Sequence, residues 1–210
     1  MNLRPTSSSR LTLTEAFVLE PSWASQFYWA RVMNRLDDVT PIVRGMERPS
    51  RPIALQITQG GRLGDFVWNT QNLVVASLKV VDLFERNGFT GYSLFSVEVR
   101  IDDEIVPDYH GIAVLGRAGP VDYERSRVQW FTRPDSSRSI SAIDGLYFDP
   151  ANWDGSDIFQ VEDFLHLLMV KRVVDALKRE RVSNFRAKPL KEFGFGPEGY
   201  PPHSWANDSA

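Results

Sequence analysis

The stretch Leu73–Val97, LVVASLKVVDLFERNGFTGYSLFSV, most constrains how this chain can fold. Its first part carries apolar residues at the three- and four-residue spacing of a helix with one buried face, which predicts a helix over about 71–87. Gly88 is placed to end that helix as a left-handed C-cap. The residues Tyr92–Ile101 then alternate between apolar and polar, as a strand does. The stretch therefore predicts a helix, a glycine stop and a strand that returns along the helix.

A similar stretch, 166–190, begins 93 residues further along the chain and predicts a second helix over about 164–181. The shift places Lys79–Asp82 on Arg172–Asp175, with two valines and the aspartate identical. An aspartate and an aromatic residue precede both helices at nearly equal distance, in Asp65-Phe66 and in Asp157-Ile158-Phe159.

Two interpretations of this similarity stay open. One is a degenerate internal duplication, with pseudo-repeats over 65–100 and 157–190. The other is a pair of unrelated amphipathic helices, each followed by a strand. The second stretch departs from the first after its helix, where Arg181 and Asn184 stand in place of Gly88 and Gly91.

The rest of the chain is predicted to consist of short strands between turns that contain glycine and proline. We therefore expect the α+β class, with a mainly antiparallel sheet and two principal helices in one domain over 1–210. The polar start and the Gly/Pro-rich end predict flexible ends over 1–10 and 195–210. The expected additional strands are Leu11–Phe17, Gln26–Met33, Pro41–Arg44, Ile53–Thr58, Tyr109–Leu115, Arg125–Phe131, Ile143–Phe148 and Asn184–Lys188.

Composition limits the compartment and the cofactors. The chain has no cysteine, which excludes disulfides and thiolate metal sites. It shows neither a signal peptide at its N-terminus nor an apolar run of the length of a membrane helix. We expect a cytoplasmic protein with no membrane partner and no cofactor.

Charge is unevenly spread along the chain. Residues 101–163 contain 5 Lys/Arg against 13 Asp/Glu, whereas the flanking regions are weakly positive. This acidic middle third is either a solvated surface or a surface that meets a basic partner. Residues 165–192 hold eight basic against three acidic side chains, but the overall charge of −3 and the lack of a recognition motif argue against nucleic-acid binding.

Motifs for catalysis and for metal binding are missing from the sequence. It contains no nucleophile elbow and no phosphate-binding loop, and its three histidines, His110, His166 and His203, lie far apart. The aspartates between 144 and 157 are too irregularly spaced for a calcium loop and suit backbone capping in turns. An enzyme that uses scattered aspartates and His110 remains an alternative.

Acidic residues near an aromatic anchor are typical of a protein-binding surface, because both can engage a basic partner. Trp153 is such an anchor, although a tryptophan buried under its own loop fits the sequence equally well. The predicted partner-binding residues are Asp102, Asp103, Glu104, Asp144, Trp153, Asp154 and Asp157.

Two segments of the chain resemble a known family. One is the Asp-Phe-X-Trp lead-in with its helix and its Gly-Phe-Thr-Gly turn, over 65–97. The other is the Trp-Asp-Gly-Ser-Asp-Ile-Phe segment, 153–159, before the second helix. Over roughly 25–190 the chain is similar to immunity proteins of bacterial polymorphic toxin systems, a family earlier catalogued as a domain of unknown function.

The resemblance implies a protein that is not an enzyme. Such a protein binds one cognate toxin, blocks its active site or substrate path, and protects the cell that makes both. Toxins that act on nucleic acids are typically basic, which would suit an acidic inhibitor. A self-assembling structural module of a secretion system is a further alternative, and the oligomeric state stays open.

Overall fold

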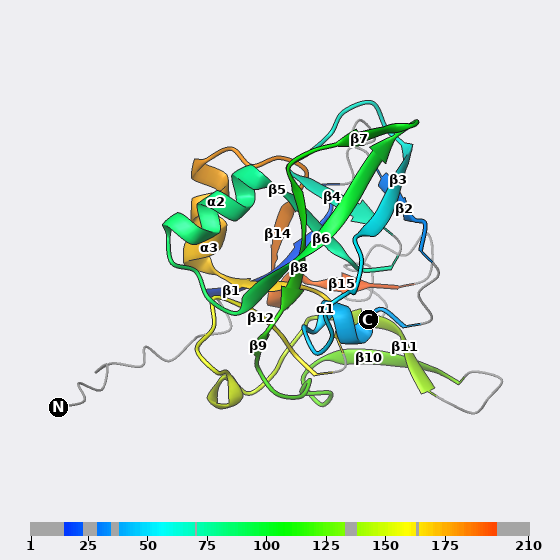
Figure 1. Ribbon diagram of the computed structural model, residues 1–210. Coiled ribbons are helices and arrows are strands. Elements are labelled where there is room, and N and C mark those ends of the chain that lie inside the picture. The colour runs from blue at the N-terminus through cyan, green and yellow to red at the C-terminus, as the bar shows by residue number, and fades with distance from the viewer. Residues whose placement is uncertain are drawn as a thin grey trace.

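A computed structural model describes residues 15–22, 29–34, 38–69, 71–132, 138–162 and 164–196. The protein is mostly β, with 43% of residues in strands and 18% in helices, and the helices are short (Figure 1). The predicted α+β class is therefore wrong: the strands form a closed barrel and two further sheets, and the helices are an addition to them.

Six strands close the barrel, in the order β3-β2-β4-β5-β8-β6 and back to β3. The β2–β4 and β3–β6 pairs are parallel, and the other neighbours are antiparallel. The strand β6 continues into a hairpin with β7 (Glu104–Val106). The bounds of the barrel strands are β2 Trp29–Val32, β3 Ile53–Gln59, β4 Phe66–Asn69, β5 Val74–Ser77, β6 Tyr92–Ile101 and β8 Tyr109–Val114.

The barrel interior is filled by apolar side chains that alternate along its strands. In β5, Val75 belongs to this inner cluster, whereas Val74 and Ala76 belong to the core outside the barrel. The short helix α1 (Thr40–Val43) adds Ile42 and Val43 to the inner cluster. Pro41–Arg44 was predicted as a strand, but these residues form α1 and its C-cap, with Pro41 in the first turn, where its lack of an N–H costs nothing.

A second, five-stranded sheet lies against the outside of the barrel, in the order β14-β1-β13-β12-β9. The larger core cluster joins this sheet to the outer face of β4, β5 and β8, through residues such as Phe66, Phe159 and Met169. The bounds are β1 Ala16–Glu20, β9 Gly116–Arg117, β12 Ile158–Gln160, β13 Leu168–Val170 and β14 Arg186–Pro189.

The two principal helices are shorter than predicted. They are α2 (Leu78–Arg86) and α3 (Lys171–Arg179), and each begins directly after a strand, β5 or β13. The predicted helices over 71–87 and 164–181 were wrong at their N-terminal ends, because β5 and β13 carry apolar residues on both faces. A strand buried on both sides is a continuous apolar run, which periodicity cannot distinguish from a helix.

A third sheet of three strands, β10-β11-β15, projects from the body (Figure 1). Its bounds are β10 Arg127–Thr132, β11 Arg138–Asp144 and β15 Gly194–Phe195. Two 3₁₀ turns, η2 (Pro150–Asn152) and η3 (Leu190–Glu192), complete the described elements. Of the expected flexible ends 1–10 and 195–210, residues 1–10 and 197–210 lie outside the described residues; Phe195 and Gly196 are described, and Phe195 pairs with β11.

The two strand–helix units end with the same backbone conformation. Gly88 and Gly91 have positive φ values of 61° and 89°, and Arg181 and Asn184 have φ values of 50° and 60° at the equivalent positions. The turns therefore match although the side chains differ. The single domain and the common origin of the two units stay predictions.

Candidate protein-binding surface

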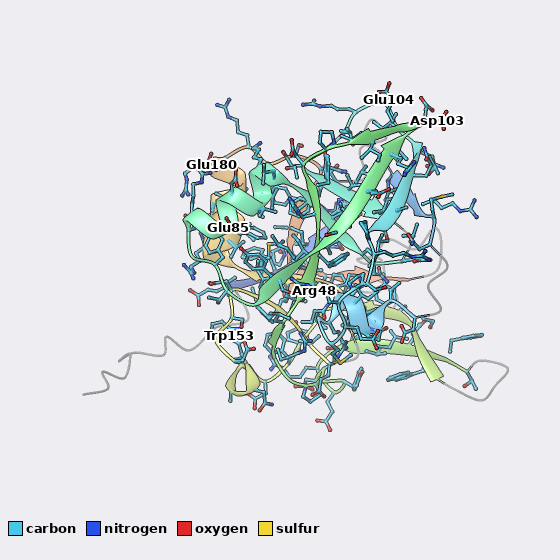
Figure 2. The ribbon with its side chains drawn as sticks, in the orientation of Figure 1. Arg48, Glu85, Asp103, Glu104, Trp153 and Glu180 are labelled. Carbon is cyan, nitrogen blue, oxygen red and sulfur yellow. The ribbon has the colours of Figure 1, made fainter. Side chains whose placement is uncertain are left out.

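The predicted residues Asp102, Asp103 and Glu104 form the tip of the β6–β7 hairpin. Ile101 pairs with Glu104, so Asp102 and Asp103 are the two turn residues between the strands. Asp102 has a φ of 52°, a conformation that aspartate tolerates better than most residues. All three side chains are exposed, and Figure 2 shows Asp103 and Glu104 pointing outward at one extreme of the molecule.

The surroundings of the tip make it strongly acidic. Residues 98–108 contain five Asp/Glu and one basic residue, Arg100. Arg100 is paired with Glu98 at 2.8 Å. Within the described part of the chain, Asp103 and Glu104 form no ion pair. Beside them, the side chain of Ile105 is 54% exposed. This acidic hairpin, Glu98–Asp108, therefore presents unpaired negative charge around an apolar side chain.

Asp144 does not belong to this surface. It lies in β11, its side chain is only 10% exposed, and Arg127 from β10 binds it at 2.8 Å. The carboxylate therefore serves as a cross-strand ion pair within the third sheet.

Trp153 and Asp154 are also occupied by their own loop. The indole Nε1 of Trp153 donates to the carbonyl of Ser156 at 2.9 Å, and its ring packs against Phe159. Asp154 accepts hydrogen bonds from the backbone N–H groups of Arg117 at 2.8 Å and Ser156 at 2.9 Å. These contacts favour the capping interpretation of the loop over an anchor for a partner.

Asp157 is buried and fully engaged. Its carboxylate binds the guanidinium of Arg172 on α3 and accepts from the N–H and hydroxyl of Thr90, at 2.9 and 3.1 Å. A carboxylate that is 6% exposed presents almost nothing to another protein. Of the seven predicted residues, the structure thus brings three together at the hairpin tip; the loop of Trp153 lies far from them (Figure 2).

A second surface was missed by the sequence interpretation. A shallow groove of about 350 Å³ runs between residues 45–48 and strands β6 and β8. Met46 and Leu115 line it and are 66% and 45% exposed. At its rim, Arg48 donates to the carbonyl of Leu94 at 3.3 Å. The segment Arg44–Arg51 holds three arginines and one glutamate, and this local excess of basic charge beside Met46 is the signal that the sequence offers.

Arg117 links the chain segments next to this groove. Its guanidinium donates to the carbonyls of Val114, Gly116 and Arg44 at 2.7–2.8 Å, so it joins α1 to β8 and β9. Burial and the neighbouring charge of Arg44 lower the pKa of Arg117, and Asp154 opposes that shift.

Burial also shifts the protonation of two other groups. It raises the pKa of Tyr109 to about 12, with a further contribution from the charge of Asp65, while the hydroxyl donates to Gly64 at 2.8 Å. It lowers the pKa of His166, against the opposing charge of Glu20, and the imidazole packs among Phe164, Phe193 and Phe195. These environments are those of packed core groups.

The alternative of an enzyme with His110 gains no geometric support. His110 lies in β8 opposite Ala76 and Ser96, and no carboxylate is hydrogen-bonded to it in the described part of the chain. No group of three or more His, Asp or Glu residues suited to a metal ion occurs among the described residues. His203 lies outside them.

Comparisons with other proteins assign no function to this chain, so its function is argued from the geometry of the structure. Neither a protein-family model nor a curated protein matches this sequence. None of the helices described has both the length and the apolar character needed to cross a membrane.

Proposed function

We propose that this chain is an immunity protein that binds and neutralises a cognate bacterial toxin, and that the acidic hairpin is its contact surface. The class of partner rests on the resemblance of segments 65–97 and 153–159 to immunity proteins. The place of contact rests on the hairpin itself.

The single observation that carries the proposal is the exposed charge of Asp103 and Glu104, neither of which forms an ion pair with another described residue. Other carboxylates of the acidic middle third, Asp144 and Asp157, are held by arginines of this chain. Exposed charge of one sign steers a partner of opposite sign and accelerates its association. The hairpin also offers Ile105, an apolar side chain that a partner can desolvate.

The structure determines which hairpin residues should be replaced to test the contact. Asp102 should be kept, because lysine at a φ of 52° would strain the turn. The test variant is Asp103→Lys with Glu104→Lys. A matched control is Asp82→Lys with Glu85→Lys, which makes the same charge change on the exposed face of α2.

The probe is the protein encoded directly upstream of this chain, produced alone and together with it. We expect that protein to arrest growth alone and to be tolerated when both are produced. At low salt the hairpin variant should associate with it about tenfold more slowly than the control, and high salt should reduce the difference. Equal association rates for the two variants would remove the hairpin from the proposal. An upstream product that is harmless, or that does not bind, would overturn the immunity role.

A further inference from the structure

The acidic hairpin and the groove beside Arg48 lie at opposite ends of one strand. Leu94, near the start of β6, lines the groove, and Ile101, at its end, leads into the hairpin tip. The seven-residue step from Leu94 to Ile101 along the strand places the groove and the hairpin tip roughly 23 Å apart. In Figure 2, Asp103 and Glu104 mark one end and Arg48 lies well away from them, near α1.

The two surfaces are complementary in charge. The tip carries Asp103 and Glu104 without ion pairs among the described residues. The rim of the groove carries Glu47 and Arg48, and a neighbouring hollow of about 280 Å³ shares both residues and adds Arg51, so two arginines stand against one glutamate along the two hollows. Both arginines are exposed. Neither forms an ion pair with a carboxylate of the described residues.

They are also complementary in shape and polarity. The tip presents one exposed apolar side chain, Ile105, between acidic neighbours. The groove presents exposed apolar walls, Met46 and Leu115, with Arg48 and Glu47 at its rim. Methionine adapts readily to the shape of an inserted side chain. A volume of about 350 Å³ leaves room for an isoleucine and the stem of an adjoining residue.

We propose that the groove of one copy of this chain receives the acidic hairpin of a second copy, in a head-to-tail contact. A contact between different surfaces on the two copies extends into rings or open chains rather than stopping at a dimer. The buried area of one hairpin tip is small, so the assembly is weak and sensitive to salt. This self-association goes beyond toxin binding, and a toxin on the hairpin would displace it.

The test uses the purified protein alone, in sedimentation velocity at increasing concentration and at low and high salt. The wild type should show a sedimentation coefficient that rises with concentration at low salt and falls back at high salt. The variant Asp103→Lys/Glu104→Lys and the variant Arg48→Glu/Arg51→Glu should each remain monomeric, because like charges then meet. The control Asp82→Lys/Glu85→Lys should associate like the wild type.

Mixing the two monomeric variants gives the decisive result. In the mixture every lysine-bearing hairpin can meet a glutamate-bearing groove, and every unchanged hairpin can meet an unchanged groove. We expect association to return, at about twice the total concentration that the wild type needs, because each hairpin can use only half of the grooves. Ile105→Ala should weaken it at least threefold without altering the charges.

Three outcomes would overturn the proposal: a wild type that stays monomeric at low salt, a variant that associates alone, or a mixture that stays monomeric. Circular dichroism of each variant checks that the substitutions leave the fold intact. None of these outcomes bears on the binding of the upstream protein, so this proposal and the immunity role fail separately.

Discussion

The carboxylate of Asp65 accepts hydrogen bonds from both the backbone N–H and the hydroxyl of Ser183, at 2.7 and 2.9 Å. Asp157 makes the same two contacts with Thr90. Asp65 precedes β4, β5 and α2, and it binds Ser183, which follows α3. Asp157 precedes β12, β13 and α3, and it binds Thr90, which follows α2. Each unit therefore holds the end of the other, and these two carboxylates join the barrel to the second sheet.

Replacing Asp157 tests whether this carboxylate stabilises the fold or serves a partner. Asp157→Asn leaves a buried amide opposite Arg172 and the Thr90 N–H, and should lower the free energy of unfolding by about 2–3 kcal/mol. This loss of stability is smaller than for a fully buried ion pair, because the side chain of Arg172 is 57% exposed.

Asp175→Asn provides the matched control for Asp157, because Asp175 is 52% exposed and pairs with Lys171 on the same helix. Its cost should stay below about 0.5 kcal/mol. Urea unfolding of both variants measures the difference. Equal stability of the two would mean that the Asp157 cluster contributes little to folding.

The pKa of Asp65 predicts how stability changes in acid. Burial would raise this pKa, but the N–H and hydroxyl of Ser183 together with Lys79 outweigh burial and hold the pKa below its ordinary value of 3.8. A lowered folded pKa contributes stability above pH 3.8, and that contribution is lost as pH falls through the folded value. Asp65→Asn should therefore be less stable at neutral pH and lose less stability between pH 4 and about pH 2. Urea unfolding across this range checks the prediction. If the free energies of unfolding of the wild type and of Asp65→Asn fall equally as the pH is lowered, the prediction is wrong.

The sequence predicted individual elements better than their assembly. Tyr92–Ile101 was predicted with its observed bounds, because alternation over ten residues is a strong strand signal. The barrel was not predicted, because its closure depends on the parallel pairing of β3 with β6, and no local pattern encodes that partnership. The apolar run Val74–Ser77 was assigned to a helix for the same reason: which layers cover its two faces is decided by tertiary packing.

The candidate site divides in the same way. Charge density along the chain marked Asp103 and Glu104 as surface residues, and both are exposed, Asp103 in the two-residue turn and Glu104 at the start of β7. The same criterion failed for Asp144 and Asp157, whose arginine partners come from neighbouring strands or from a helix. Sequence shows the charge of a residue, whereas its availability depends on partners that only the fold supplies.

The raised pKa of Tyr109 predicts how the stability of the protein changes at alkaline pH. Burial raises its pKa to about 12, so the folded protein favours the neutral phenol. The folded pKa lies above the ordinary value of 10.0; the stability that this group contributes is therefore complete below pH 10 and is lost as pH rises toward 12. Absorbance of tyrosinate should show late titration from Tyr109 and from Tyr92, whose pKa burial also raises, and Tyr109→Phe should remove the contribution of Tyr109 alone. A titration curve unchanged by the substitution would place the late group elsewhere.

Alanine substitutions at Gly88 and Gly91 distinguish the cost of a left-handed backbone from the cost of a steric clash. Both have positive φ, but a Cβ at Gly88 meets open space, whereas a Cβ at Gly91 would lie 2.0 Å from the carbonyl oxygen of Ile158. Gly88→Ala should therefore cost only the left-handed conformation, about 1 kcal/mol. Gly91→Ala must also displace the backbone of β12 at the junction with the second sheet.

We therefore expect Gly91→Ala to cost at least about 3 kcal/mol, because the obstacle is backbone and cannot rotate away. Thermal and urea unfolding of the two variants measure the difference. The reverse substitution at the equivalent turn, Arg181→Gly, supplies the control: it releases a non-glycine residue from a φ of 50° and should leave stability within about 1 kcal/mol of the wild type, since greater freedom of the unfolded chain offsets the relief. Equal costs at Gly88 and Gly91 would show that the contact between the α2 turn and β12 is looser than a 2.0 Å approach allows.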